Sequence, residues 1–197
     1  MIVPPFEKHY TVDGTGNTVA DIGGFLGLER IITEKLTAQF GVSGYGDMDF
    51  SPSGDVWQFA QPQFASVGYS YKVHLARMMF ANKLLTTIPQ YKVIRPYFSW
   101  EIGAAFNRAT AYQETPLIPQ AFTMAPYSNH SNTSFAWGVG LGFDYEVTAK
   151  IRAGIGYQFA DLGSVSLGNS PAAATNQTLS IPNLYTNQLR FQLTYLL

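Results

Sequence analysis

Large apolar residues alternate with small or polar ones along residues 134–147, near the middle of the chain. One parity holds aromatic and branched side chains from Phe135 to Tyr145, and the other holds glycine, alanine and serine up to Asp144. A period of two over that length predicts a β-strand. At ~3.3 Å per residue the stretch extends about 46 Å, enough to cross the apolar core of a bilayer at a tilt of about 40°. We therefore predict that it is one strand of a transmembrane barrel.

The two faces of this stretch also indicate what surrounds each of them. A soluble barrel places its large apolar residues inside and abundant charge outside. Here the second face is too small and too poor in charge to solvate an exterior. We therefore expect the bulky face to contact lipid and the small face to line a narrow lumen, where the glycines leave room for longer side chains from neighbouring strands.

Six other stretches show the same alternation, and short and long connections separate them in turn. The predicted strands cover residues 20–32, 36–46, 64–85, 93–109, 151–159 and 187–197. Tight turns lie near residues 33, 89 and 148, and long loops lie near residues 55, 120 and 175. Outer-membrane barrels place short connections in the periplasm and long ones outside the cell. The two halves of residues 64–85 favour opposite parities, so we expect a β-bulge near His74 or Leu75.

Closure of such a barrel predicts one strand more than the alternation reveals. Bacterial barrels have an even number of strands, and seven convincing stretches are present. The first strand then comes from residues 1–12 or from a segment upstream of Met1, and we favour the upstream position. Residues 1–18 are then an irregular N-terminal segment or the first extracellular loop, and residues 19–197 form the barrel domain. The start MIVPPFEKHY also lacks the pattern of an export signal, which we expect upstream as well.

Composition excludes several other classes of protein. The 197 residues fit one domain, and charged residues make up only 13% against a typical ~25%. A net charge of -1 gives no basic surface for nucleic acid, and no run of apolar residues is long enough for a transmembrane helix. The mean hydropathy near zero is what an alternating barrel shows. Without cysteines there is neither a disulfide framework nor a thiolate metal site, and we expect no cofactor.

Three segments carry a resemblance to a known family. They are IRPYFSWEIGAAFN (94–107), FAWGVGLGFDYEVTAKIRAGIGYQFADLG (135–163) and NQLRFQLTYLL (187–197). They resemble the small eight-stranded outer-membrane barrels of Gram-negative bacteria, the OmpA-like and opacity-protein group, over about residues 20–197. The resemblance implies an antiparallel up-and-down, multi-pass, monomeric barrel in the bacterial outer membrane. It also implies a C-terminal signal for the barrel-assembly machinery at Leu193, Tyr195 and Leu197, where the terminal leucine departs from the commoner aromatic residue.

Charged and aromatic residues fall on the two predicted faces in different ways. The inward faces collect Asp21, Glu29, Arg77, Lys83, Arg95, Glu101, Asp144, Arg152 and Arg190. Charges in so narrow a lumen should pair, which predicts a structural plug of salt bridges. The alternative is a narrow pore for small solutes, in which Glu101 exchanges partners among Arg95, Arg152 and Arg190. The outward faces and strand ends predict a lipid-facing aromatic girdle of Phe98, Trp100, Phe135, Trp137, Phe143, Tyr145, Tyr157 and Tyr195. Tyr69, Tyr71 and Tyr97 are assigned to the same girdle.

Few residues suggest catalysis or metal binding. His74 lies four residues from Ser70 and one predicted strand from Glu101, which allows an outer-membrane lipid esterase as an alternative function. The three aspartates of residues 47–55 lack the spacing of a calcium loop. Our prediction is therefore a non-enzymatic outer-membrane barrel that contacts membrane lipid. Its long loops are expected to bind a host surface or another envelope component, or to support envelope integrity, and no nucleic acid is expected to bind.

Overall fold

The structure is a computed structural model that describes residues 8–13, 18–58, 61–91, 93–119, 121–123, 126–169 and 178–197. The strands are β1 (Lys8–Tyr10), β2 (Ile22–Thr33), β3 (Leu36–Phe50), β4 (Ser53–Gln58), β5 (Ala65–Thr86), β6 (Ile94–Pro116), β7 (Tyr127–Ser128), β8 (His130–Glu146), β9 (Ile151–Asp161), β10 (Val165–Ser166), β11 (Gly168–Asn169), β12 (Ser180–Ile181) and β13 (Tyr185–Tyr195), with one 3₁₀ turn, η1 (Pro62–Phe64). No helix in these ranges is long and apolar enough to span a bilayer.

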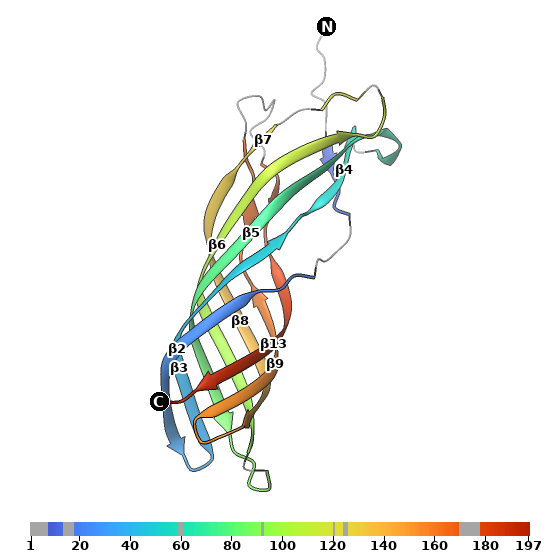
Figure 1. The fold of residues 1–197 in the computed structure, drawn as a ribbon. Coiled ribbons are helices and arrows are strands. Elements are labelled where there is room, and N and C mark those ends of the chain that lie inside the picture. Colours follow the sequence, from blue (N-terminus) through green and yellow to red (C-terminus); the bar gives the residue numbers. More distant parts are fainter. Residues whose placement is uncertain are drawn as a thin grey trace.

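The long strands form one antiparallel sheet that curls strongly around a common axis (Figure 1). Its order is β2, β3, β5, β6, β8, β9, β13, which follows the order of the chain. Threonine hydroxyls stabilise two of the short turns, since Thr33 accepts from the backbone N–H of Lys35 and Thr148 from that of Ile151. The sheet confirms the predicted all-β, antiparallel, up-and-down class.

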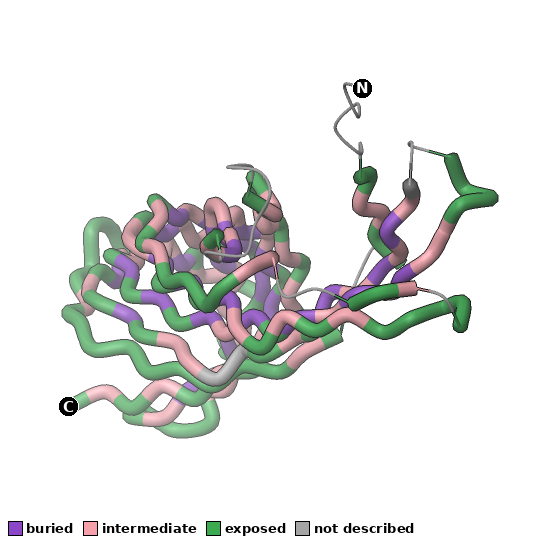
Figure 2. The backbone as a smooth tube through the Cα atoms, turned by 90° about the horizontal axis from the view of Figure 1, so that it is seen from above, coloured by how far each residue is buried: buried purple, intermediate pink, exposed green. Residues whose placement is uncertain are grey.

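The two faces of the sheet follow the alternation that the sequence predicts. On β8, Phe135 is 67% exposed, Leu141 61% and Phe143 53%, whereas Ala136 and Gly138 between them are buried. Figure 2 shows buried and exposed residues alternating along the curled strands in the same way. The large side chains thus lie on the outer face of the curled sheet. They do not form the core of a water-soluble protein.

Beyond the membrane-crossing part, strands occupy much of what the sequence predicts to be loop. The end of β3, up to Phe50, and the whole of β4 lie within predicted loop 47–63. β4 pairs with the beginning of β5. β6 continues to Pro116, and β8 begins at His130, within predicted loop 110–133. Figure 1 shows β4, β5 and β6 continuing upward together beyond the upper end of β2. The prediction of loops in these two segments is wrong, because β4 continues to pair with β5, β5 with β6, and β6 with β8.

The change of parity expected from a bulge near His74 or Leu75 is wrong, although the pairing of β3 with β5 does have an irregularity beside Leu75, on β3 between Tyr45 and Met48. β5 keeps one parity, and Tyr69, Tyr71, Val73 and Leu75 point inward as Arg77 does, all being at most 6% exposed. The apolar residues of β5 change from inward positions in its first half to outward positions in its second half because the surroundings of the strand change. Within the membrane the apolar side chains face outward to lipid, whereas outside it they turn inward and polar residues face the water. The irregularity with β6 lies higher, between Ser70 and Lys72.

These inward-facing residues form an apolar core above the lumen, which we call the cap. Its buried aliphatic part contains Val56, Val67, Val73, Leu162, Val165 and Leu167. The ring of Tyr69 stacks on Tyr71 and Tyr112 with centroids 6.4 and 6.2 Å apart, and Tyr112 meets Tyr127 edge to face at 4.9 Å. The hydroxyl of Tyr69 donates to the carbonyl oxygen of Thr11 at 2.7 Å. The cap therefore connects the segment that holds β1 to the long strands.

The cap tyrosines should titrate late. Burial raises the pKa of Tyr69 and of Tyr71 to about 12, because ionisation would place a phenolate in apolar surroundings. A raised pKa favours the neutral form in the folded state, so this contribution to stability is complete below the unfolded pKa of ~10 and is lost as the pH rises through about 12. Tyrosinate absorbance during alkaline titration should show a late step that a Tyr71→Phe variant reduces. A single step near the ordinary pKa would contradict a dry cap.

The two ends of the sheet, β2 and β13, are not paired with each other in the described part of the chain. A free strand edge leaves backbone N–H and C=O groups without partners, which is costly in lipid. A further strand, as closure of a barrel requires, would satisfy both edges and stays a prediction. Side chains already connect the two sides through the lumen, since Arg152 on β9 contacts Glu29 on β2 and Arg190 on β13 contacts Tyr45 on β3.

Candidate functional site

The middle of the lumen holds a polar cluster centred on Glu101. Gln158 donates to Oε1 of this carboxylate, and Nη2 of Arg190 lies 3.4 Å from the same oxygen. The hydroxyl of Tyr45 donates to Oε2 at 3.5 Å. Glu101 is only 4% exposed, and a buried carboxylate is tolerated only when it is paired and hydrogen-bonded. These three partners therefore hold the carboxylate in its buried position.

Tyr45 connects this cluster to a second cation, Arg77. The guanidinium carbons of Arg77 and Arg190 lie 4.2 and 4.5 Å from the centroid of the Tyr45 ring. Nη2 of Arg77 donates to Asp21 at 2.9 Å and to Gln188 at 3.0 Å. The ring attracts both guanidinium groups through its quadrupole. A single aromatic side chain thus lets two like charges share one narrow section of the lumen.

A second cluster lies nearer the periplasmic turns. Arg152 binds Glu29 through two parallel hydrogen bonds of 2.5 and 2.8 Å, the geometry in which guanidinium and carboxylate interact most strongly. Gln39 donates to Glu29 at 2.7 Å. Glu146 contacts Nε of Arg95 at 2.8 Å and Nε of Arg152 at 3.5 Å. The clamp between Arg152 and Glu29 joins two strands that are far apart in the chain.

Lys83 and Asp144 complete the lumen with an ion pair of 3.0 Å. Gln192 donates to the same carboxylate at 2.8 Å, and the Lys83 ammonium lies 4.1 Å from the centroid of the Tyr97 ring. Tyr97 itself occupies space that glycines leave open, because a β-carbon added to Gly156 would lie 2.0 Å from its hydroxyl oxygen. The small face of β8 and β9 is therefore filled by longer side chains from neighbouring strands.

The structure places all seven predicted network residues on the lumen side. These are Asp21, Glu29, Arg95, Glu101, Asp144, Arg152 and Arg190, and each has a charged or amide partner there. Of the three cations in the pore hypothesis, Arg190 lies beside Glu101, whereas Arg95 and Arg152 lie with Glu146 and Glu29. Sequence reasoning missed the partners Glu146, Gln158 and Gln188, although each has inward parity and could have been found by extending the alternation.

The predicted girdle residues lie on the outer face of the sheet. Phe98, Phe135, Phe143, Tyr145, Tyr157 and Tyr195 are between 47% and 67% exposed, and Trp100 and Trp137 are partly exposed. Tyr69, Tyr71 and Tyr97 are buried instead, so their inclusion in the girdle is wrong, and the inward position of Tyr97 is the one that the alternation of residues 93–109 predicts. Leu193 and Leu197, proposed with Tyr195 as an assembly signal, are 78% and 107% exposed at the free end of β13. Contact of these residues with lipid or with the assembly machinery stays a prediction.

The residues of the esterase hypothesis are not brought together. His74 faces outward and its Nδ1 contacts Asp49 at 2.7 Å, whereas Glu101 is buried in the lumen. Ser70 lies four residues away along β5, a separation of about 13 Å in a strand. No group of three or more His, Asp or Glu side chains within the described ranges is placed to hold a metal ion. The three residues of the esterase hypothesis therefore do not form one catalytic set in the described ranges.

The extracellular end of β5 and β6 carries a different surface, which we call the apolar tip. It consists of Phe64, Leu117, Ile118 and Phe122, which are 50%, 50%, 45% and 89% exposed. The two loops are adjacent because the N–H of Leu117 donates to the carbonyl of Ser66 at 2.9 Å. Residues 58–65 and 115–126 contain no charged residue. Exposed apolar surface without charge is typical of a site that contacts another molecule.

The curled antiparallel sheet, the apolar exterior and the charge-paired lumen define a small outer-membrane β-barrel protein. The chain is distantly homologous to outer membrane protein PagN of Salmonella typhimurium, with 30% identity over 83 residues. The match covers 42% of this chain but only 33% of that protein, so the chain matches about a third of its relative. No family model and no solved structure matches the chain. The homology and the fold together place the protein in the outer membrane, as the sequence analysis predicts.

Proposed function

We propose that the protein is a non-enzymatic outer-membrane barrel whose apolar tip binds an apolar surface of another molecule outside the cell. The observation that carries this proposal is the exposure of Phe122, Ile118 and their neighbours at the end of three paired strands. The cap supports the tip from below, because its buried core holds β5 and β6 in place. The paired charges in the lumen favour a filled interior over passage of small solutes.

A non-enzymatic role agrees with the separation of His74, Ser70 and Glu101 in the structure. The homology to a protein named only as an outer membrane protein points in the same direction. Membrane lipid around the barrel and a protein or cell surface at the tip are then the partners. The role of the barrel is to hold the tip at a fixed distance from the membrane.

Two polar substitutions in the tip should weaken binding. Burying a large apolar side chain is worth about 1.5–3 kcal/mol, so Ile118→Ser with Phe122→Ser should weaken adhesion by at least about tenfold. The measurement compares bacteria that display either variant on cultured host cells and on hydrophobic and hydrophilic glass. Both residues are exposed, so folding should not change. Heat-modifiable migration on gels checks this.

The matched control is Val12→Ser, because Val12 is 65% exposed and lies outside the tip. Binding that survives the tip substitutions unchanged would overturn the proposal. Equal loss in the control would show a general effect of surface hydrophobicity. Deletion of residues 113–130 is a poorer test, since it removes Tyr127 and the end of β6 and so disturbs the cap.

A further inference from the structure

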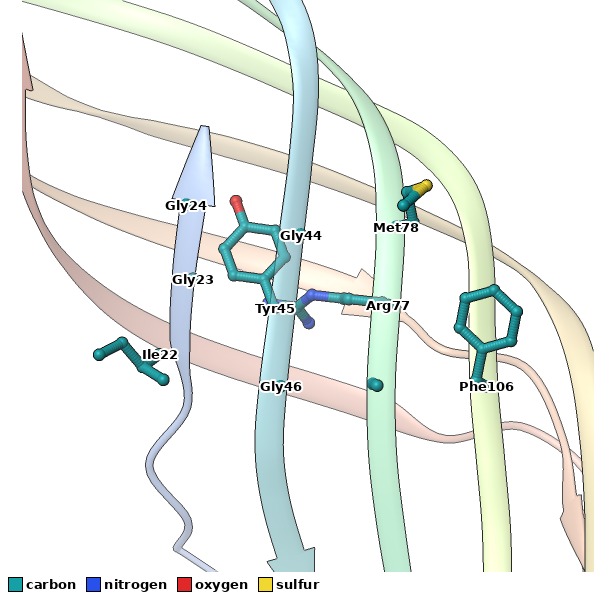
Figure 3. Close-up of a pocket in the computed structure, with 10 residues that line it drawn as sticks. Ile22, Gly23, Gly24, Gly44, Tyr45, Gly46, Arg77, Met78 and Phe106 are labelled. Carbon is teal, nitrogen blue, oxygen red and sulfur yellow. The ribbon is translucent and has the colours of Figure 1, made fainter. Parts of the chain in front are cut away.

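The outer face of the sheet contains a hollow where β2 begins at Ile22, beside the middle parts of β3, β5 and β6 (Figure 3). Its volume is about 490 Å³, with Gly24, Gly44 and Gly46 at its floor and Ile22, Met78 and Phe106 around them. A β-carbon added to any of these three glycines would have no atom within 4 Å. The hollow is therefore open on the outer side at these glycines, and Tyr45 and Arg77 of the lumen cluster also line it.

The position of Phe106 along β6 places the hollow in the bilayer. The outward alternation begins at Ile94 and reaches Phe106, a distance of about 30 Å along the membrane normal for a strand tilted by ~40°. The apolar band of such a barrel is ~25 Å tall. Phe106 thus lies just above the band, and Met78, which pairs with Ala104 one row lower, lies at its upper edge. The next outward row on the strands lies at the level of the lipid headgroups.

That next row is cationic. Arg108 faces His74 across β5 and β6, and Lys72 lies one outward position further up β5. Both Lys72 and Arg108 are exposed, and neither forms an ion pair with any residue in the described ranges. Asp49, a carboxylate in this row, is engaged by His74 at 2.7 Å. Two cations therefore lie on the outer face of β5 and β6 beyond Phe106, the residue of β6 that lines the hollow.

We propose that this outer surface binds a phosphate-bearing lipid of the outer leaflet. The phosphate lies between Lys72 and Arg108, and an acyl chain fills the hollow over Gly24 and Gly44. Arginine and lysine at the headgroup level attract anionic lipid, and their long stems cover apolar surface while the charge reaches the phosphate. The apolar hollow contributes as much as the two cations, because a flat sheet surface with the same charges would not hold an acyl chain in one place.

The test measures which lipid stays bound. The protein is refolded into nanodiscs of phosphatidylcholine with a minor fraction of phosphatidylglycerol, and the lipids retained after transfer to detergent are counted by native mass spectrometry. Each cation near a membrane surface contributes about fivefold in affinity for anionic lipid. We expect the wild-type protein to retain phosphatidylglycerol selectively and the Lys72→Gln, Arg108→Gln variant to reduce that selectivity by about 25-fold.

The matched control is Arg30→Gln with Lys35→Gln, which removes two exposed cations at the opposite, periplasmic rim. Its selectivity should equal that of the wild type, and an equal loss would overturn the proposal in favour of general electrostatic attraction. Inorganic phosphate added during the transfer should not displace the lipid. Displacement at modest concentration would show a site for a free anion and would also overturn the proposal.

A further variant tests the hollow separately from the charges. Gly44→Phe places a ring in the open space above the strand without meeting another atom at its β-carbon, so the protein should fold as the wild type does. Retention of phosphatidylglycerol should nevertheless fall to the level of the double cation variant, because the chain loses its place. Undiminished retention in a folded Gly44→Phe variant would show that the hollow takes no part in binding.

Discussion

A valine in place of Gly142 is expected to destabilise the barrel strongly. Its β-carbon would lie 2.3 Å from the carbonyl oxygen of Ile155 and 2.6 Å from the α-carbon of Gly156, with Cζ of Tyr97 at 2.7 Å. Two of these atoms belong to the backbone of β9 and cannot rotate away, so β8 and β9 would have to separate. We expect a loss of about 3 kcal/mol or more, measured from urea unfolding of refolded protein in detergent.

Two matched glycine variants show whether the lumen is the cause. Gly44→Val on the outer face meets nothing within 4 Å and should change stability by less than about 0.5 kcal/mol. Gly156→Ala meets mainly the hydroxyl of Tyr97, 2.0 Å away, so Tyr97→Phe should restore part of the lost stability. Wild-type stability in the Gly142→Val variant would contradict the close approach of these strands.

The membrane-crossing strands could be predicted because lipid and lumen demand opposite residues. Phe135, Leu141 and Phe143 fall on one face and Gly138 on the other, and a register shift of one residue would exchange the two surroundings. Alternation therefore carries both the strand and its orientation. The same reasoning identified the inward charges, since only the lumen offers them partners.

The extracellular extension could not be predicted in the same way because its surroundings are reversed. Tyr69, Tyr71 and Val73 look like a lipid-facing row, but they point into the cap. Above the bilayer, water replaces lipid outside the sheet, and apolar side chains gain most by turning inward. The alternation thus keeps its period of two, but the apolar residues change from the outward face to the inward face. Reading that change as a bulge gave the error at His74.

The partners of the lumen charges depend on the curvature of the sheet. Glu29 and Arg152 are separated by 123 residues, and they meet only because the sheet curls enough to bring β2 close to β9. Sequence alternation determines the face of each residue but contains no information on that curvature. The pore hypothesis placed Arg152 near Glu101 for this reason, whereas the structure pairs it with Glu29.

Arg152→Met is expected to destabilise the barrel by about 3 kcal/mol or more. Arg152 is only 4% exposed, and its removal takes both guanidinium hydrogen bonds from the Glu29 carboxylate. A buried charge left without its partner costs far more than the pair contributes when both members are present. Because Gln39 still donates to Glu29, the loss should lie at the lower end of the range for buried pairs. Urea unfolding in detergent measures it.

The neighbouring Arg30→Met variant is the control, because Arg30 is exposed on the outer face of the same strand as Glu29. It should lose less than about 1 kcal/mol. Adding Glu29→Gln to Arg152→Met should restore much of the stability, since the double variant leaves no unpaired carboxylate at this point. Independent, additive losses would mean that the two side chains do not interact in the membrane. The clamp would then play no part in holding β2 against the rest of the sheet.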